Sequence, residues 1–139
     1  MKTKNEIVFN QDFGGREKYF TKKKDLITGD CVIRACAIAT GTEYFETMQE
    51  MFKIGLEMKR LPNSDAVSDK FLTDRGFKKC PAHSIGFTKK RYKVKDFPAN
   101  PNSVYVIRTA NHMTVIDQLL HRDSWNCGAW AAQSYYVKG

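Results

Sequence analysis

Three residues of this 139-residue chain have the types that nucleophilic thiol chemistry requires. Cys31 supplies a thiol, His112 a base and Asp123 a carboxylate. A cysteine nucleophile needs its thiolate form, a base beside it and a third group that holds the base in orientation. We therefore expect a Cys-His-Asp triad in which Cys31 attacks a carbonyl carbon, His112 moves the proton and Asp123 orients His112.

The segment that carries Cys31 predicts a buried helix over residues 31–40. It is apolar almost all round and rich in small residues, which suits close packing against other backbone. Asp30 is a favourable N-cap residue and Gly41 a stop signal. Cys31 would then lie in the first turn, where the positive end of the helix dipole stabilises a thiolate.

The spacing of His112 and Asp123 indicates a hairpin. A strand over 113–120 with a turn near Gln118 would bring residue 112 opposite residue 123 or 124. The Asp123 carboxylate could then accept the imidazole N–H and fix its tautomer. Trp125 would shield that hydrogen bond from water. The alternative is that Asp123 ends a strand in a turn and that Trp125 belongs to the core.

The remaining histidines and cysteines are weaker candidates. His83 has no evident orienting partner, and His121 falls at the far end of the strand that begins near residue 112. Cys127 falls in a turn near His121 and Asp123, which leaves a metal site as a minor alternative. No Cys-x-x-Cys pair is present, so the usual zinc spacings are absent and we prefer the interpretation without a metal. The thiol chemistry itself needs no cofactor, and we expect none.

The rest of the pattern predicts one α+β domain over residues 1–139, with an N-terminal helical lobe packed on a small antiparallel sheet. Residues 1–28 are polar and turn-rich and predict an extended N-terminal arm, or short strands that lie on the domain. Further helices are expected over about 43–59 and from 64 or 65 to before 76, and further strands over 103–109 and 133–137. The second helix is expected to bury one face, made of Tyr44, Met48, Met51, Phe52 and Leu56.

The three motifs together resemble those of papain-like cysteine peptidases. Residues 29–31 (Gly-Asp-Cys) are similar to the Gly-Ser-Cys of that family, and residues 111–113 (Asn-His-Met) to its Asp-His-Ala. Residues 123–130 (Asp-Ser-Trp-Asn-Cys-Gly-Ala-Trp) resemble its Asn-Ser-Trp-Gly-x-x-Trp, with Asp in place of Asn. The resemblance implies the papain-like fold and a cysteine peptidase or related acyl-transfer enzyme. The Asp in place of Asn and the small size resemble bacteriocin-processing peptidase domains and small phage proteins of the same fold. Its substrate would be a peptide or isopeptide bond.

One position departs from that family. A Gln about six residues before the Cys donates to the oxyanion in the family, but here that position is Asp25, whose carboxylate repels an oxyanion. Gln11 is the only Gln upstream, and the backbone N–H of Cys31 is the remaining candidate donor. Losing one oxyanion donor costs roughly 100- to 1000-fold in rate. The departure supports an alternative, a papain-like fold that no longer performs catalysis.

The charge of the chain suggests what such a fold would bind. Lys and Arg number 23 against 15 Asp and Glu, a net charge of +8. Residues 87–95 form a basic strip whose charged members are Lys89, Lys90, Arg91, Lys93 and Lys95. Such a strip can bind nucleic acid or an acidic host protein, although it is also typical of a solvated loop or edge strand.

Composition limits the class of protein. Hydrophobic residues make up 42%, enough for a folded core. No apolar run approaches the roughly 20 residues of a membrane span. The basic start has no apolar stretch behind it, so we expect no signal peptide, no membrane partner and a cytoplasmic location, which is the host cytoplasm if the protein is phage-encoded.

Overall fold

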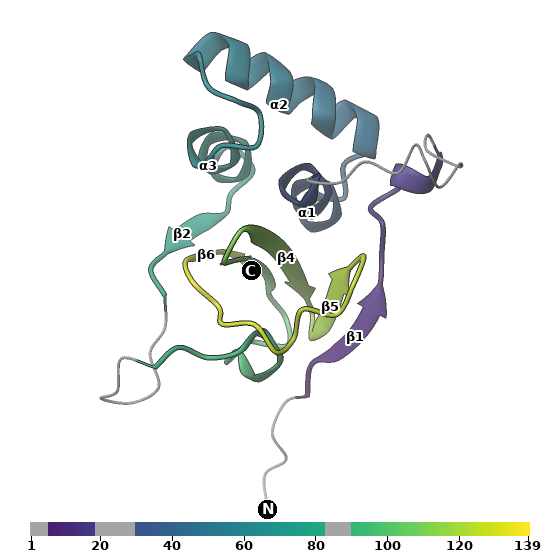
Figure 1. The fold of residues 1–139 in the computed structure, drawn as a ribbon, viewed down its shortest axis with the longest axis vertical. Coiled ribbons are helices and arrows are strands. Elements are labelled where there is room, and N and C mark those ends of the chain that lie inside the picture. The colour runs from purple at the N-terminus through teal and green to yellow at the C-terminus, as the bar shows by residue number, and fades with distance from the viewer. Residues whose placement is uncertain (1–5, 19–29, 83–89) are drawn as a thin grey trace, which may run out of the picture.

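The computed structural model describes residues 6–18, 30–82 and 90–139. These residues form an α+β fold in which three helices lie together on one side of a six-stranded sheet (Figure 1). The helices are α1 Cys31–Thr40, α2 Tyr44–Met58 and α3 Asp65–Thr73. The strands are β1 Val8–Gln11, β2 Lys78–Cys80, β3 Val104–Thr109, β4 His112–Asp117, β5 Leu120–Asp123 and β6 Tyr135–Lys138. Two short 3-10 helices, η1 Arg16–Lys18 and η3 Val94–Asp96, complete the elements.

The sheet is mixed, which corrects the expected antiparallel sheet. Its strand order is β1-β5-β4-β3-β6-β2, and every neighbouring pair is antiparallel except β1 with β5. The N-terminal segment therefore does more than extend along the domain, because residues 8–11 pair with the outer strand of the β4–β5 hairpin. This pairing covers an edge that would otherwise expose unpaired backbone groups beside the site.

The helices agree with the sequence in position, but α2 buries a different face from the predicted one. Tyr44 and Met51 are buried as expected, whereas Phe52 is 47% and Leu56 79% exposed. The helix packs against α1 and α3 along a stripe made of Tyr44, Thr47, Met51, Ile54 and Gly55. None of the helices in the described ranges is long and apolar enough to cross a membrane.

The core lies on both faces of the sheet. On the helical side, Met113 and Val115 of β4 pack with residues of all three helices. Ile116 belongs to a second cluster with Phe97 and Ala132, which come from the segments that follow η3 and precede β6. The β4 strand is therefore buried on both faces, and its first residue lies beside the N-terminus of α1.

Candidate active site

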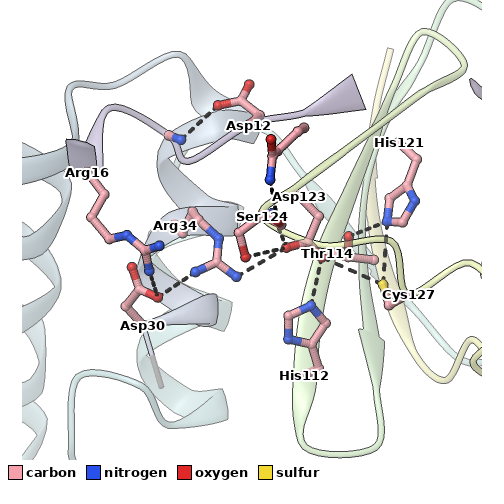
Figure 2. A network of polar contacts seen from close by, with 12 residues as sticks. Asp12, Arg16, Asp30, Arg34, His112, Thr114, His121, Asp123, Ser124 and Cys127 are labelled. Atoms are coloured by element: carbon pink, nitrogen blue, oxygen red, sulfur yellow. Dashed lines mark hydrogen bonds and ion pairs between the residues drawn. The ribbon is translucent and has the colours of Figure 1, made fainter. Parts of the chain in front are cut away.

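The start of α1 places Cys31 as the sequence predicts. The helix begins at this residue, so its backbone N–H belongs to the first turn, whose N–H groups have no partner within the helix. Asp30 occupies the N-cap position but makes no side-chain cap, which corrects its expected role. Its buried carboxylate instead accepts hydrogen bonds from Arg16 at 3.0 Å and from Arg34 (Figure 2). It also accepts one from the hydroxyl of Tyr44 at 3.0 Å.

His112 links the thiol to the carboxylate. Its Nε2 lies 2.7 Å from Oδ2 of Asp123, and both side chains are buried. The imidazole also makes a hydrogen bond with Cys31, for which Nδ1 is the remaining ring nitrogen. The structure thus brings together the three residues of the predicted triad, in the order in which a proton would pass between them.

The hairpin that carries His112 differs in register from the predicted one. Asp117 pairs with Leu120 around a two-residue turn in which both residues have positive φ. Continuing this register places His112 opposite Trp125 rather than opposite residue 123 or 124. The contact with Asp123 is therefore diagonal across the hairpin, which a side chain of this length can make.

Trp125 covers the imidazole, as the sequence suggested. The ring centroids of Trp125 and His112 are 4.8 Å apart, with an angle of 40° between the planes. Trp125 also packs edge-on against Trp130 at 5.5 Å. Because Trp125 is 40% exposed while His112 is buried, the indole lies between the imidazole and solvent rather than in the core.

Asp123 has a second cationic partner, Arg34, that the sequence analysis missed. Nη2 of Arg34 donates to Oδ1 at 3.1 Å, and the backbone N–H of Ser124 donates to the same oxygen at 2.7 Å (Figure 2). Oδ2 is left for His112. The only local signal for this role was a single charged residue in an otherwise apolar helix, one turn after Cys31.

These contacts shift the pKa of every member of the triad toward its charged form. Burial acts against the charge on each group, but the hydrogen bonds and nearby charges outweigh it. The hydrogen bond with His112 lowers the pKa of Cys31 below its ordinary value of 9.0. Hydrogen bonds with Asp123, Cys127 and Cys31 raise the pKa of His112 to about 11. The hydrogen bond with His112 lowers the pKa of Asp123 to about 2. The site therefore favours a thiolate–imidazolium pair.

A second thiol lies behind this pair. Cys127 is fully buried, with its Sγ 3.4 Å from Nε2 of His121 and 3.6 Å from Oδ2 of Asp123 (Figure 2). Nε2 of His121 also lies 2.8 Å from Oγ1 of Thr114. Burial lowers the pKa of His121 and outweighs the opposite effect of the Asp123 charge, and the nearby charge of His112 acts in the same direction as burial. The imidazole of His121 is therefore neutral.

Of the two candidate oxyanion residues, the structure describes Gln11 but not Asp25. Gln11 lies on β1, where its Nε2 donates to the backbone carbonyl of Ser124 at 3.1 Å. This contact holds the chain directly after Asp123. Asp25 lies outside the described residues, as does His83. The backbone N–H of Cys31 is the donor that the described part of the chain offers at the start of α1.

The basic strip is partly described. Lys89 lies outside the described residues. Lys90, Arg91, Lys93 and Lys95 are all exposed, and the backbone of this stretch is held by a bridge between Lys93 and Ala131. The exposed basic side chains thus lie just before and at the start of the segment, residues 94–99, that covers the second face of the sheet.

Comparison with known proteins does not assign the chain to a family. No protein-family model, curated protein or solved structure matches it. The functional conclusion therefore depends on the geometry of the site.

Proposed function

We propose that this protein is a cysteine hydrolase or acyl-transfer enzyme, of papain-like type, that acts on a peptide or isopeptide bond. The observation that carries the proposal is the arrangement of Cys31, His112 and Asp123. A thiol at the N-terminus of a buried helix makes a hydrogen bond with an imidazole whose Nε2 lies 2.7 Å from a buried carboxylate. This is the arrangement that activates a cysteine nucleophile.

In the proposed reaction, the Cys31 thiolate attacks the carbonyl carbon and forms a tetrahedral oxyanion. The backbone N–H of Cys31 donates to that oxygen. As the C–N bond breaks, His112 gives its Nδ1 proton to the leaving amine, and a thioester remains on Cys31. A water molecule, or an acceptor amine, then attacks the thioester while His112 takes its proton. The C–S bond breaks, and the acid or the new amide leaves a free Cys31 thiolate beside a protonated His112.

Asp123 and Arg34 support this proton transfer without touching the substrate. The Asp123 carboxylate holds His112 in one tautomer and stabilises the imidazolium. The positive charge of Arg34, which binds the other carboxylate oxygen, stabilises the negative charge of Asp123. Asp123 therefore stays deprotonated through both proton transfers. Both are positioning residues for His112.

A p-nitrophenyl ester tests the proposal because it needs no knowledge of the natural substrate. We expect a burst of one equivalent of nitrophenolate, an acyl group on Cys31 by mass spectrometry, and then slow turnover. Cys31→Ala should remove the burst and the adduct. Cys80→Ala is the matched control, since Cys80 lies on β2 at the opposite edge of the sheet from the hairpin, and it should keep both. An equal burst from Cys31→Ala would overturn the proposal.

A second candidate function, binding of an acidic partner, is favoured by the exposure of Lys90, Arg91, Lys93 and Lys95 and by the net charge of +8. Fluorescence polarisation with a labelled single-stranded oligonucleotide tests it. Binding should weaken steeply with salt and should survive Cys31→Ala. Replacing Arg91 and Lys93 by Glu, which reverses their charges, should weaken the binding of the oligonucleotide. No binding at low salt would contradict this function.

A further inference from the structure

Cys127, His112 and Asp123 converge on one point inside the protein. One atom from each, namely the Cys127 sulfur, a ring nitrogen of His112 and a carboxylate oxygen of Asp123, lies within 4.8 Å of the other two. All three side chains are buried. The proposed thiol mechanism uses His112 and Asp123 but gives Cys127 no part. A buried thiol placed at the carboxylate end of the triad therefore needs its own explanation.

The donor set is one that zinc prefers. Zn²⁺ binds thiolate sulfur at about 2.3 Å and imidazole nitrogen or carboxylate oxygen at about 2.0–2.2 Å, usually in a tetrahedron. Neighbouring ligand atoms in such a tetrahedron are roughly 3.3–3.6 Å apart. Cys127 Sγ already lies 3.6 Å from Oδ2 of Asp123. The 2.7 Å contact between His112 and Asp123 needs to open by only about 0.6 Å to reach this range.

The surroundings also suit a bound cation. Nε2 of His121 lies 3.4 Å from Cys127 Sγ, where its N–H can donate to a metal-bound thiolate and fix its direction. The guanidinium of Arg34 beside Asp123 also binds Asp30, whose carboxylate offsets part of its charge and is shared with Arg16. Two anionic ligands, the Cys127 thiolate and the Asp123 carboxylate, then remain to balance the charge of a divalent ion.

We propose that Cys127, His112 and Asp123 bind a Zn²⁺ ion, and that the bound ion switches off the thiol chemistry of Cys31. Binding releases one proton from the Cys127 thiol and one from Nε2 of His112. An ion held between Nε2 of His112 and Oδ2 of Asp123 replaces the 2.7 Å contact by which Asp123 orients the imidazole, so the triad that Cys31 needs cannot assemble while the ion is bound. The binding itself is independent of the proposed function, whereas the inhibition rests on it.

Cobalt absorption tests the binding separately from the activity. The full chain carrying Cys31→Ser, freed of metal by a chelator, is titrated with Co²⁺, whose thiolate complex absorbs in the near ultraviolet. We expect this absorption band in the Cys31→Ser protein, in which Cys127 is intact. We also expect it in a control protein that carries Cys80→Ser in addition to Cys31→Ser. Cys127→Ser should remove the band and weaken binding by roughly 100-fold, and His121→Gln should weaken it roughly 10- to 100-fold. The His121 variant keeps the test decisive if the Cys127 variant fails to fold by circular dichroism.

The second measurement is the rate of Cys31 alkylation with and without Zn²⁺. Zinc should slow the alkylation of Cys31 at least tenfold in the wild-type protein. In Cys127→Ser, the alkylation rate should be the same with and without zinc. Equal Co²⁺ binding with and without Cys127 would overturn the metal site. Metal binding with unchanged alkylation would overturn the inhibition. An unreactive Cys31 in the metal-free protein would overturn the proposed function alone, because the cobalt result would still stand.

Discussion

Arg34 on α1 donates a 3.1 Å hydrogen bond to the carboxylate of Asp123 on β5, and both side chains are buried. The same guanidinium binds Asp30 at the start of α1. Together with the contact between Cys31 and His112, this ion pair links the helix that carries the nucleophile to the hairpin that carries its base. It therefore helps to set the distance between the two.

Arg34→Met should destabilise the fold and loosen the site. Removing one partner of a buried ion pair costs about 3–5 kcal/mol, because the other charge is left uncompensated. We expect a loss of that size in the free energy of unfolding, measured by urea titration. Lys70→Ala breaks the exposed Lys70–Asp74 pair on α3 and should leave the urea midpoint unchanged. Equal stability of wild type and Arg34→Met would contradict the bridging role of Arg34.

Asp123 should make stability depend on acid pH. Its pKa in the folded state is about 2, below its ordinary value of 3.8. A carboxyl group with a lowered pKa contributes stability that is complete above its unfolded pKa and is lost as the pH falls through the folded pKa. Wild type should lose stability as the pH falls from about 3.8 to about 2, and the less stable Asp123→Asn should show a flatter slope over this range. Urea titrations at several pH values measure both slopes, and parallel curves would refute the assignment.

Trp125→Ala should weaken the proton transfer while sparing the fold. Without the indole, water reaches the hydrogen bond between His112 and Asp123 and competes for it. If the loss of shielding removes the typical net contribution of a hydrogen bond, about 1 kcal/mol, the alkylation rate of Cys31 near neutral pH should fall roughly fivefold. Trp130→Ala is the matched control, because the indole of Trp130 packs against Trp125, whereas Trp125 packs against His112. The effect of Trp130→Ala on the alkylation rate should be smaller. Equal effects would argue against shielding by Trp125.

The helix at Cys31 could be predicted because its signals are local. Residues 31–40 form one apolar run bounded by a capping residue and a glycine, and Gly41 ends α1 with a φ of 68°. The role of Arg34 could not be predicted, since its partner Asp123 lies 89 positions along the chain. The parallel pairing of β1 also had no local signal, because it depends on which edge of the sheet remains open.

The hairpin register was missed because its turn has unusual residues. Gln118 and Leu119 adopt φ values of 49° and 70°, a conformation that Asn, Asp or Gly normally marks in a sequence. Without such a marker, the sequence predicts the turn near Gln118 but places its centre half a residue to one residue too early. Similarly, the face of α2 was misjudged because Phe52 and Leu56, although apolar, are exposed. Cys127 could be placed near Asp123 by sequence proximity, but its approach to the imidazole of His112 needed the fold.

Gly55→Ala should destabilise the end of α2. A Cβ at this position would lie 2.6 Å from the backbone oxygen of Arg60, because the chain turns back over the helix immediately after Lys59. Backbone cannot yield as a flexible side chain can, so we expect a loss of about 1–3 kcal/mol in thermal or urea unfolding. Gln49→Ala, at an exposed position of the same helix, should be neutral. A fully stable Gly55→Ala would show that the turn after α2 is packed differently.

The most direct test of the thiolate–imidazolium pair is the pH dependence of Cys31 alkylation by iodoacetamide, followed by mass spectrometry. The pKa of Cys31 is held below its ordinary value of 9.0 by the hydrogen bond with His112. The midpoint of the wild-type profile should therefore lie below pH 9.0, and His112→Ala should move it upward. Coincident profiles for the two proteins, or a wild-type Cys31 that titrates as an ordinary thiol, would contradict the proposed mechanism.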